Sequence, residues 1–149
     1  MNFKSILCLG MLFCISVSYS QNLSIYKSKK GVDETTQSIV QLIKDRGLEY
    51  FETVDHDKIA KERGIEIPPT KVILFEDSAL TSKLITCQQT TALDLPLKIL
   101  VWEENEDVYI GFINPSDMEK RFMLNDCHDT IEALSRLMIR LVTDVMRAM

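Results

Sequence analysis

The sequence predicts an α+β protein, in which a mixed, largely antiparallel sheet of about five strands packs against helices in two layers. Apolar segments of strand length recur between segments with a helical 3.6-residue period. The last two strand candidates flank a short acidic loop typical of a hairpin, and an amphipathic helix candidate follows them. The 149 residues include only 5 Gly and 4 Pro and show no repeat or linker, which favours one domain.

The first half of the chain alternates strand and helix candidates. They are a strand at 23–26, a helix at 33–46, a strand at 48–54 and a short helix ending at Gly64. Asp33 is the expected N-cap of the first helix and Gly47 its left-handed stop. The second strand is rich in aromatic and β-branched residues. Asp55 or Asp57 is expected to cap the short helix.

The second half begins with a nearly continuous apolar run at 71–75, which predicts a central strand covered on both faces. The further candidates are a helix from Asp77 or Ser78 to about 85, strands at 97–102 and 108–113 joined by the acidic loop 103–107, and a last helix at 129–147. Ser116 with Glu119 has the spacing of a capping box, and Asp129 with Glu132 repeats that spacing at the last helix.

The last helix has an unusually wide apolar face. Its apolar residues cover an arc of roughly 200°, whereas a helix lying on a sheet needs a stripe of a little over 100°. They are Ile131, Leu134, Leu137, Met138, Ile139, Leu141, Val142, Val145, Met146 and Met149. Either a partner chain covers part of this arc, giving a homodimer, or the helix lies in the groove of a curved sheet beside another helix.

Residues 1–20 have the organisation of a secretory signal peptide. Lys4 precedes the apolar run 6–17, and the small residues Ser18 and Ser20 suit cleavage before Gln21. The run is shorter than the roughly 20 residues of a spanning helix, so no membrane span is expected after cleavage. We therefore expect an exported protein, periplasmic or secreted, whose mature form is the single domain 21–149.

The charge and the cysteine content indicate which partners and cross-links the protein could have. The net charge is −5 with acids and bases interspersed, which argues against a nucleic-acid partner. Cys8 and Cys14 belong to the leader, which leaves Cys87 and Cys127. A disulfide between them would close a loop of about 40 residues and add on the order of 4 kcal/mol. Two separate buried thiols are the preferred interpretation, because a domain of this size needs no cross-link.

The candidate chemistry is sparse. His56 lies between Asp55 and Asp57, where a carboxylate could orient its ring, although the first turn of a helix explains the same residues. The segment 126–129 contains three kinds of metal ligand, but consecutive side chains splay apart, so we expect no metal site and no cofactor. A site joining His56, Cys87, Cys127 and His128 stays open at this stage. The hydroxyls of Thr90 and Thr91 and the carboxylate of Asp94 suit either the rim of a pocket or hydrogen bonds to the backbone of a turn.

Several segments together resemble domain-of-unknown-function family 302 (DUF302) over about residues 24–122. They are Glu34-Thr35-Thr36, His56 with Ala60 and Gly64, Pro68-Pro69-Thr70 before a strand, and Leu93-Asp94-Leu95-Pro96 before the next. The resemblance implies a two-layer α/β domain that tends to form dimers, and no established reaction. The chain departs from the family at Glu76-Asp77-Ser78, where Gly-Asn-Pro is common, and at Phe112-Ile113-Asn114-Pro115, where Tyr-Asn-Asp-Pro is frequent.

Four polar residues persist in this pattern, namely His56, Thr70, Asp94 and Asn114, each at the end of an expected element. If they converge, they line one polar cleft. The main hypothesis is an exported, dimeric, non-catalytic module that binds a small ligand there or serves the envelope. One alternative is a hydrolase or isomerase with His56 and Asp94 as its acid–base pair. Another is a structural or interaction protein of the envelope.

Overall fold

The structure is a computed structural model that describes residues 23–124 and 126–148. The expected signal peptide at 1–20 lies outside the described residues. No helix among the described residues combines the length and the apolar character that crossing a membrane requires.

Within the described residues, five strands and five α-helices follow one another with a single 3₁₀ helix, η1. They are β1 (Leu23–Lys27), α1 (Val32–Asp45), β2 (Glu49–Asp55), α2 (His56–Lys61), β3 (Thr70–Glu76), α3 (Ser78–Cys87), η1 (Gln89–Leu93), β4 (Leu97–Glu104), β5 (Asp107–Ile113), α4 (Ser116–Arg121) and α5 (His128–Ala148). The strands form one open sheet in the order β1-β5-β4-β3-β2. This confirms the α+β class, the five strands and the long C-terminal helix.

All four strand pairings are antiparallel, so the described sheet has no parallel neighbours. The apolar run 71–75 forms β3, which is an inner strand, but β4 occupies the centre because β5 and β1 add on its other side. The loop 104–107 closes a tight hairpin in which Asn105 and Glu106 both have positive φ, 53° and 68°. Such a pair of left-handed residues matches the twist of the strands it connects.

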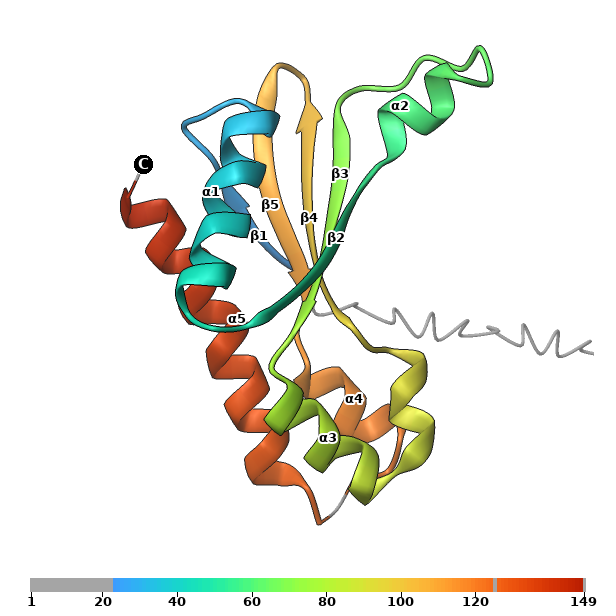
Figure 1. The fold of residues 1–149 in the computed structure, drawn as a ribbon, viewed down its shortest axis with the longest axis vertical. Helices are drawn as coiled ribbons and strands as arrows, with labels where there is room; N and C mark the ends of the chain where they lie inside the picture. The colour runs from blue at the N-terminus through green and yellow to red at the C-terminus, as the bar shows by residue number, and fades with distance from the viewer. Residues whose placement is uncertain (1–22, 125, 149) are drawn as a thin grey trace, which may run out of the picture.

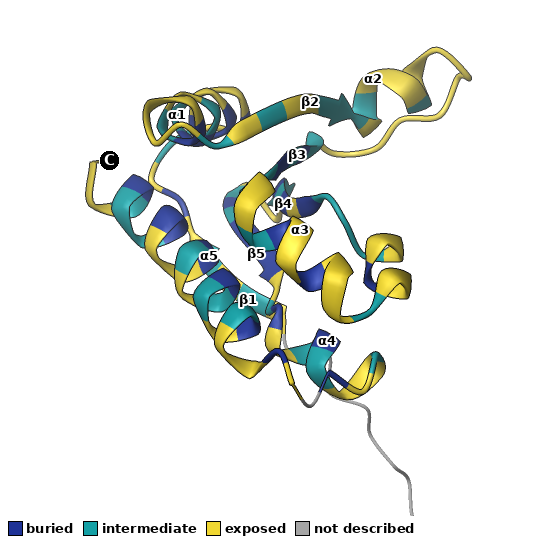
Figure 2. Cartoon of the chain, turned by 60° about the horizontal axis from the view of Figure 1, so that its bottom comes forward, coloured by how far each residue is buried: buried dark blue, intermediate teal, exposed yellow. Residues whose placement is uncertain are grey.

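Helices α1 and α5 lie along the same face of the sheet, as Figures 1 and 2 show. The core is formed where this inner face meets the helices. Its largest fully buried side chains are Phe75, Ile39, Ile43, Ile73, Leu84, Ile99, Ile110, Ile131, Leu134, Met138, Leu141 and Val101. Helix α5 also contacts α1, α3 and α4, so most of its apolar arc is covered within the chain, although Ile139 stays exposed.

Strand β3 corrects one expectation. Ile73 and Phe75 are fully buried against the helices, but Val72 and Leu74 on the other face are only half-buried. The described chain therefore covers one face of this strand rather than two.

The predicted helix caps are confirmed at some helix ends and are wrong at others. Gly47 and Gly64 both have the expected left-handed φ, +68° and +73°. Asp77 caps α3, since one carboxylate oxygen accepts from the backbone N–H groups of Ala79 and Leu80 at 3.1 Å. Helix α1, however, starts before Asp33, after the extended Gly31.

Neither proposed capping box forms. The side chain of Asn114 accepts from the Ser116 N–H at 3.0 Å, Pro115 holds the cap position of α4, and Ser116 is already helical. Helix α5 begins at His128, so Asp129 lies inside its first turn.

Candidate functional site

A cleft of about 260 Å³ lies at the lower end of the sheet in Figure 1, where β4 begins and β5 ends. Polar and apolar side chains share its walls. They are Asp94, Leu97, Lys98, Ile113, Asn114, Pro115, Met118, Arg121 and Met138. The cleft therefore contains two of the four residues singled out in the sequence, Asp94 and Asn114.

Asp94 and Arg121 join the two sides of the cleft. Asp94 follows η1 and precedes β4, and Arg121 is the last residue of α4. Arg121 Nη1 donates to Asp94 Oδ2 at 2.5 Å, while the guanidinium carbon lies 5.9 Å from the centroid of the Phe122 ring. A charged pair of this kind holds the η1–β4 connection against α4.

Lys98 supplies a second cation. Its ammonium donates to the backbone carbonyls of Asp94 at 3.0 Å and Pro96 at 2.9 Å, in a segment that contains the cis Leu95–Pro96 peptide bond. Partial burial lowers the pKa of Lys98, because it disfavours the charged form, and the nearby Asp94 charge only partly opposes this effect. An ammonium carries three donors, so one remains beyond the two carbonyl bonds.

Asn114 connects the cleft to both flanking helices. Its side-chain oxygen accepts from the Ser116 N–H at 3.0 Å and from the Ser135 hydroxyl of α5 at 2.9 Å. These two bonds fix the orientation of the amide, whose NH₂ group provides two further donors.

A disulfide between Cys87 and Cys127 ties the same region together, with Cα atoms 6.4 Å apart. The preferred interpretation of two separate thiols was therefore wrong. The bridge joins the end of α3 to the loop before α5, and Cys127 lies six positions after Arg121. Segments 87–94 and 121–127 are thus linked twice, once by the disulfide and once by the Asp94–Arg121 ion pair.

The cysteine pairing also rules out the metal site of His56, Cys87, Cys127 and His128 that the sequence had left open, because the two sulfur atoms are bonded to each other. Within 23–124 and 126–148, no three His, Cys, Asp or Glu side chains lie close enough to hold a metal ion. His128 instead places Nδ1 3.0 Å from Glu119 Oε1, and this hydrogen bond raises the pKa of the imidazole.

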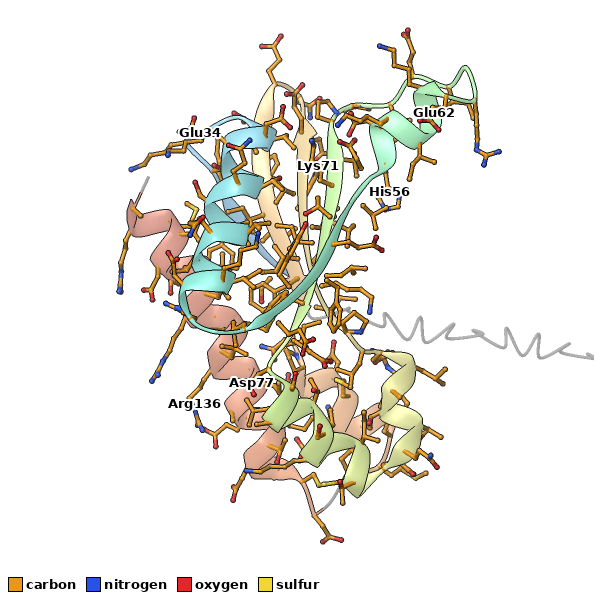
Figure 3. The ribbon with its side chains drawn as sticks, viewed as in Figure 1. Glu34, His56, Glu62, Lys71, Asp77 and Arg136 are labelled. Carbon is orange, nitrogen blue, oxygen red and sulfur yellow. A yellow bond between two sulfur atoms is a disulfide. The ribbon has the colours of Figure 1, made fainter. Side chains whose placement is uncertain are left out.

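His56 and Thr70 lie at the other end of the sheet. Figure 3 labels His56 beside α2, far from Asp77 at the start of α3. Along the paired strands, Thr70 faces Trp102 and Phe75 faces Leu97, so the two ends of β3 are about 17 Å apart at the usual rise per residue. The structure therefore brings Asp94 and Asn114 together but does not bring His56 to Asp94.

The residues around His56 have structural partners. Asp55 caps α2 by accepting from the Lys58 N–H at 3.2 Å, and Asp57 accepts from the Thr70 N–H at 2.9 Å. His56 itself is exposed at the first position of α2. This is the first-turn interpretation that the sequence had left open.

Lys98 and Arg121 were missed in the sequence. The signal for Lys98 was a single cation inside the otherwise apolar strand expected at 97–102, two positions after Pro96. Arg121 gave no local signal, because it reaches Asp94 across 27 positions of the chain.

Comparisons with known proteins agree with this architecture. The model of the domain of unknown function DUF302 matches residues 25–141. Proteins named fluoride-specific ion channel FluC 1 from Brucella suis and Brucella abortus are each 32% identical over 99 residues, or 66% of this chain. The matched segment is only 39% and 37% of those proteins, so the chain spans less than half of their length.

A crystal structure of an uncharacterized conserved DUF302 protein from Bacillus stearothermophilus has the same fold. It superposes with a TM-score of 0.70 at 16% identity, covering 86% of this chain and 98% of that one. The family match spans most of the sheet, the cleft and much of α5, and the chain therefore belongs to the DUF302 family.

Proposed function

We propose that this protein is an exported, non-catalytic module that binds a small anionic ligand with an apolar body in the cleft. The proposal rests on one observation. Lys98, Arg121 and Asn114 line the same concave site as several apolar side chains. Ligand sites of this class combine a mostly apolar lining with a few convergent polar groups.

The charge of the cleft favours an anion. Two cations face one carboxylate, so the site has a surplus of one positive charge in a chain whose net charge is −5. An anionic ligand would also favour the charged form of Lys98, which burial disfavours. Leu97, Met118 and Met138 offer the surface for a hydrocarbon part.

The size of the cleft favours a small ligand. Its 260 Å³ falls just below the roughly 300–1,000 Å³ of drug-sized sites. A short-chain carboxylate meets both the charge and the size requirement.

Binding has more structural support than the acid–base alternative. A general acid and base must approach one substrate at about 2.6–3.2 Å, whereas His56 and Asp94 lie at opposite ends of the sheet. An accessory role at the envelope is supported by the relatives, in which the matching segment forms part of longer proteins named as ion channels. The disulfide supports export, because such bonds persist in oxidising compartments.

Titration with matched probes tests the ligand proposal. Hexanoate, hexylammonium and fluoride are added in turn to the ¹⁵N-labelled protein, up to about 10 mM, which detects millimolar dissociation constants. We expect hexanoate alone to shift the amide signals of Lys98, Asn114 and Arg121. Equal shifts with hexylammonium, or no shift at these residues, would overturn the proposal, and a response to fluoride alone would replace the ligand class.

Two variants test whether hexanoate binds in the cleft. Lys98→Gln is expected to weaken hexanoate binding at least tenfold, because it removes the surplus charge of the cleft. Arg136→Gln is the matched control, since Arg136 pairs with Glu132 on the exposed side of α5. Equal affinities of the two variants would show that binding lies elsewhere.

Export has its own test. We expect the protein expressed in a bacterial host to be recovered outside the cytosol with Gln21 as its first residue. Intact chains beginning at Met1 in the soluble cytosolic fraction would contradict the proposal.

A further inference from the structure

The Cys87–Cys127 disulfide is accessible from one side. Cys87 is exposed at the end of α3, whereas Cys127 is only 6% exposed. A surface hollow of about 390 Å³ borders the bond, and its walls include both cysteines, Gln88 and Met123. A thiolate that approaches from outside the molecule therefore reaches Cys87 more easily than Cys127.

The two cysteines also lie at helix ends of opposite polarity. Cys87 is the last residue of α3, whereas Cys127 precedes the 21-residue α5 and its carbonyl accepts the Ile131 N–H at 3.1 Å. A helix N-terminus favours negative charge and a C-terminus disfavours it, so a thiolate is more stable at Cys127 than at Cys87. Asp126 and Asp129 oppose this effect, but both are exposed and solvent screens their charges.

We propose that this bond is a site of thiol–disulfide exchange, at which a dithiol protein attacks Cys87 through the hollow and loosens one wall of the cleft. The partner's first thiolate bonds to Cys87 Sγ, the bond to Cys127 breaks, and Cys127 leaves as a thiolate that takes a proton from water. The partner's second thiolate then attacks the partner's first sulfur, and Cys87 leaves and is protonated in turn. Two electrons and two protons thus pass from the partner to this chain.

The partner needs a second thiol. The Cα atoms of Cys87 and Cys127 are 6.4 Å apart, so the released Cys127 stays beside the mixed disulfide and can reform the original bond. A monothiol is expelled by this return reaction, whereas a dithiol closes its own disulfide and leaves. The same steps in reverse insert the bond when the partner arrives oxidised, as in an oxidising compartment.

The bond also controls how firmly one wall of the cleft is held. Segments 87–94 and 121–127 are joined by the disulfide and by the Asp94–Arg121 ion pair. Reduction leaves the ion pair, in which the Arg121 side chain is 50% exposed, and pairs exposed to this degree contribute little stability. We therefore expect both segments to move more in the reduced protein. The exchange itself does not depend on the ligand proposed for the cleft.

A thioredoxin that keeps only its attacking cysteine tests which sulfur is attacked, because its reaction stops at the mixed disulfide. It is mixed with the oxidised wild-type protein, and acid then protonates the released thiolate so that the original bond cannot reform. Peptide mapping by mass spectrometry locates the adduct. We expect at least about tenfold more adduct at Cys87 than at Cys127. Equal adducts, or adducts only after unfolding in urea, would overturn the proposal.

A matched pair of variants tests the route through the hollow. Met123 is 77% exposed in its wall, and Leu93 is 82% exposed on η1 outside it, so both positions tolerate glutamate. We expect Met123→Glu to slow reduction by intact thioredoxin at least about threefold, because the added charge repels the attacking thiolate. Leu93→Glu should change the rate by less than about twofold. Equal rates in the two variants would contradict an approach through the hollow.

Hydrogen–deuterium exchange tests the effect on the cleft. The oxidised wild-type protein is compared with the same protein reduced by dithiothreitol. We expect the amides of 87–94 and 121–127 to exchange at least about tenfold faster after reduction, while those of α1 keep their rates. Unchanged exchange in the two segments, or an equal acceleration in α1, would overturn the proposed loosening of the cleft wall.

Discussion

At the lower end of the sheet, the segments around α3 and α4 are held by a disulfide and by buried side chains. At the upper end, α2 is anchored instead by the ion pairs of Asp55 with Lys58 and Lys71. Leu84 of α3, Met118 of α4 and Thr91 of η1 are all buried. In contrast, α2 buries no residue and every residue from 61 to 68 is exposed.

This difference bears on which residues can form a precise site. Binding groups need neighbours that fix their geometry, and Asp94, Asn114 and Arg121 each have such neighbours. His56, with an equally suggestive sequence context, has no burial to hold its ring in one place. The lower end therefore has the fixed side-chain geometry that a small-ligand site requires, whereas His56 at the upper end does not.

The disulfide gives the largest expected effect at the lower end. Replacing both Cys87 and Cys127 by serine should reduce the free energy of unfolding by about 4 kcal/mol, because the bond closes a 40-residue loop in the unfolded chain. Urea unfolding of the oxidised wild type and the double variant measures the difference. A loss below about 1 kcal/mol would mean that α3 and the 121–127 segment hold together without the bond.

Truncation of apolar residues compares the two ends directly. Leu84→Ala at the lower end should cost about 3 kcal/mol, because the side chain is fully buried and its removal leaves a cavity. Ile65→Ser, in the exposed loop after α2, should change the free energy of unfolding by less than about 0.5 kcal/mol. Both variants are measured by urea unfolding under the same conditions. Similar costs at both sites would contradict the contrast between the ends.

Local signals explain why most of the fold could be predicted from the sequence. Strand periodicity, left-handed glycines such as Gly47 and the Asp77 cap depend on neighbours within a few residues. They gave the elements to within a few positions. The failed capping box of Ser116 shows the limit of this approach, because the Asn114 side chain took the N–H that the box would have used.

The candidate site was predicted only in part because its partners are distant in sequence. Asp94 and Asn114 could be singled out at strand ends, but their convergence depends on the order β5-β4-β3. The same order separates His56 from Asp94, since β3 runs the length of the sheet between them. The disulfide could be raised from the sequence but not preferred, because the approach of Cys87 to Cys127 follows from the packing of α3 on α5.

Helix caps give a smaller effect at the lower end. Asp77→Ala should destabilise the protein by about 1 kcal/mol, because two backbone N–H groups at the start of α3 lose their acceptor. Ser116→Ala should be almost neutral, since the Ser116 side chain makes no cap hydrogen bond at α4. Thermal unfolding of the two variants checks the pair. If Ser116→Ala destabilised the protein as much as Asp77→Ala, the Ser116 side chain would have to cap α4 after all.

The smallest expected effect is a pH dependence at the upper end. Lys71 Nζ lies 2.6 Å from Asp33 Oδ1 and 2.9 Å from Asp55 Oδ2, and these two hydrogen bonds raise the pKa of Lys71. Burial alone would raise the pKa of Asp55, but hydrogen bonds from Lys71 and Lys58 outweigh it and hold that pKa well below the ordinary 3.8. Asp55 therefore stabilises the fold above about pH 4, and this contribution is lost as the pH falls towards its folded pKa. For Lys71 the sign is opposite, so its contribution is complete below about pH 10 and is lost above that.

Asp55→Asn isolates the acid side of this dependence, because asparagine still caps α2 but carries no charge. Urea unfolding between about pH 2 and 5 should show a weaker decline of stability with falling pH in the variant than in the wild type. The difference should be modest, since Asp33 is 79% exposed and solvent screens its share of the network. Identical slopes would mean that the upper end is not held by these charges, and the contrast between the two ends would then rest on burial alone.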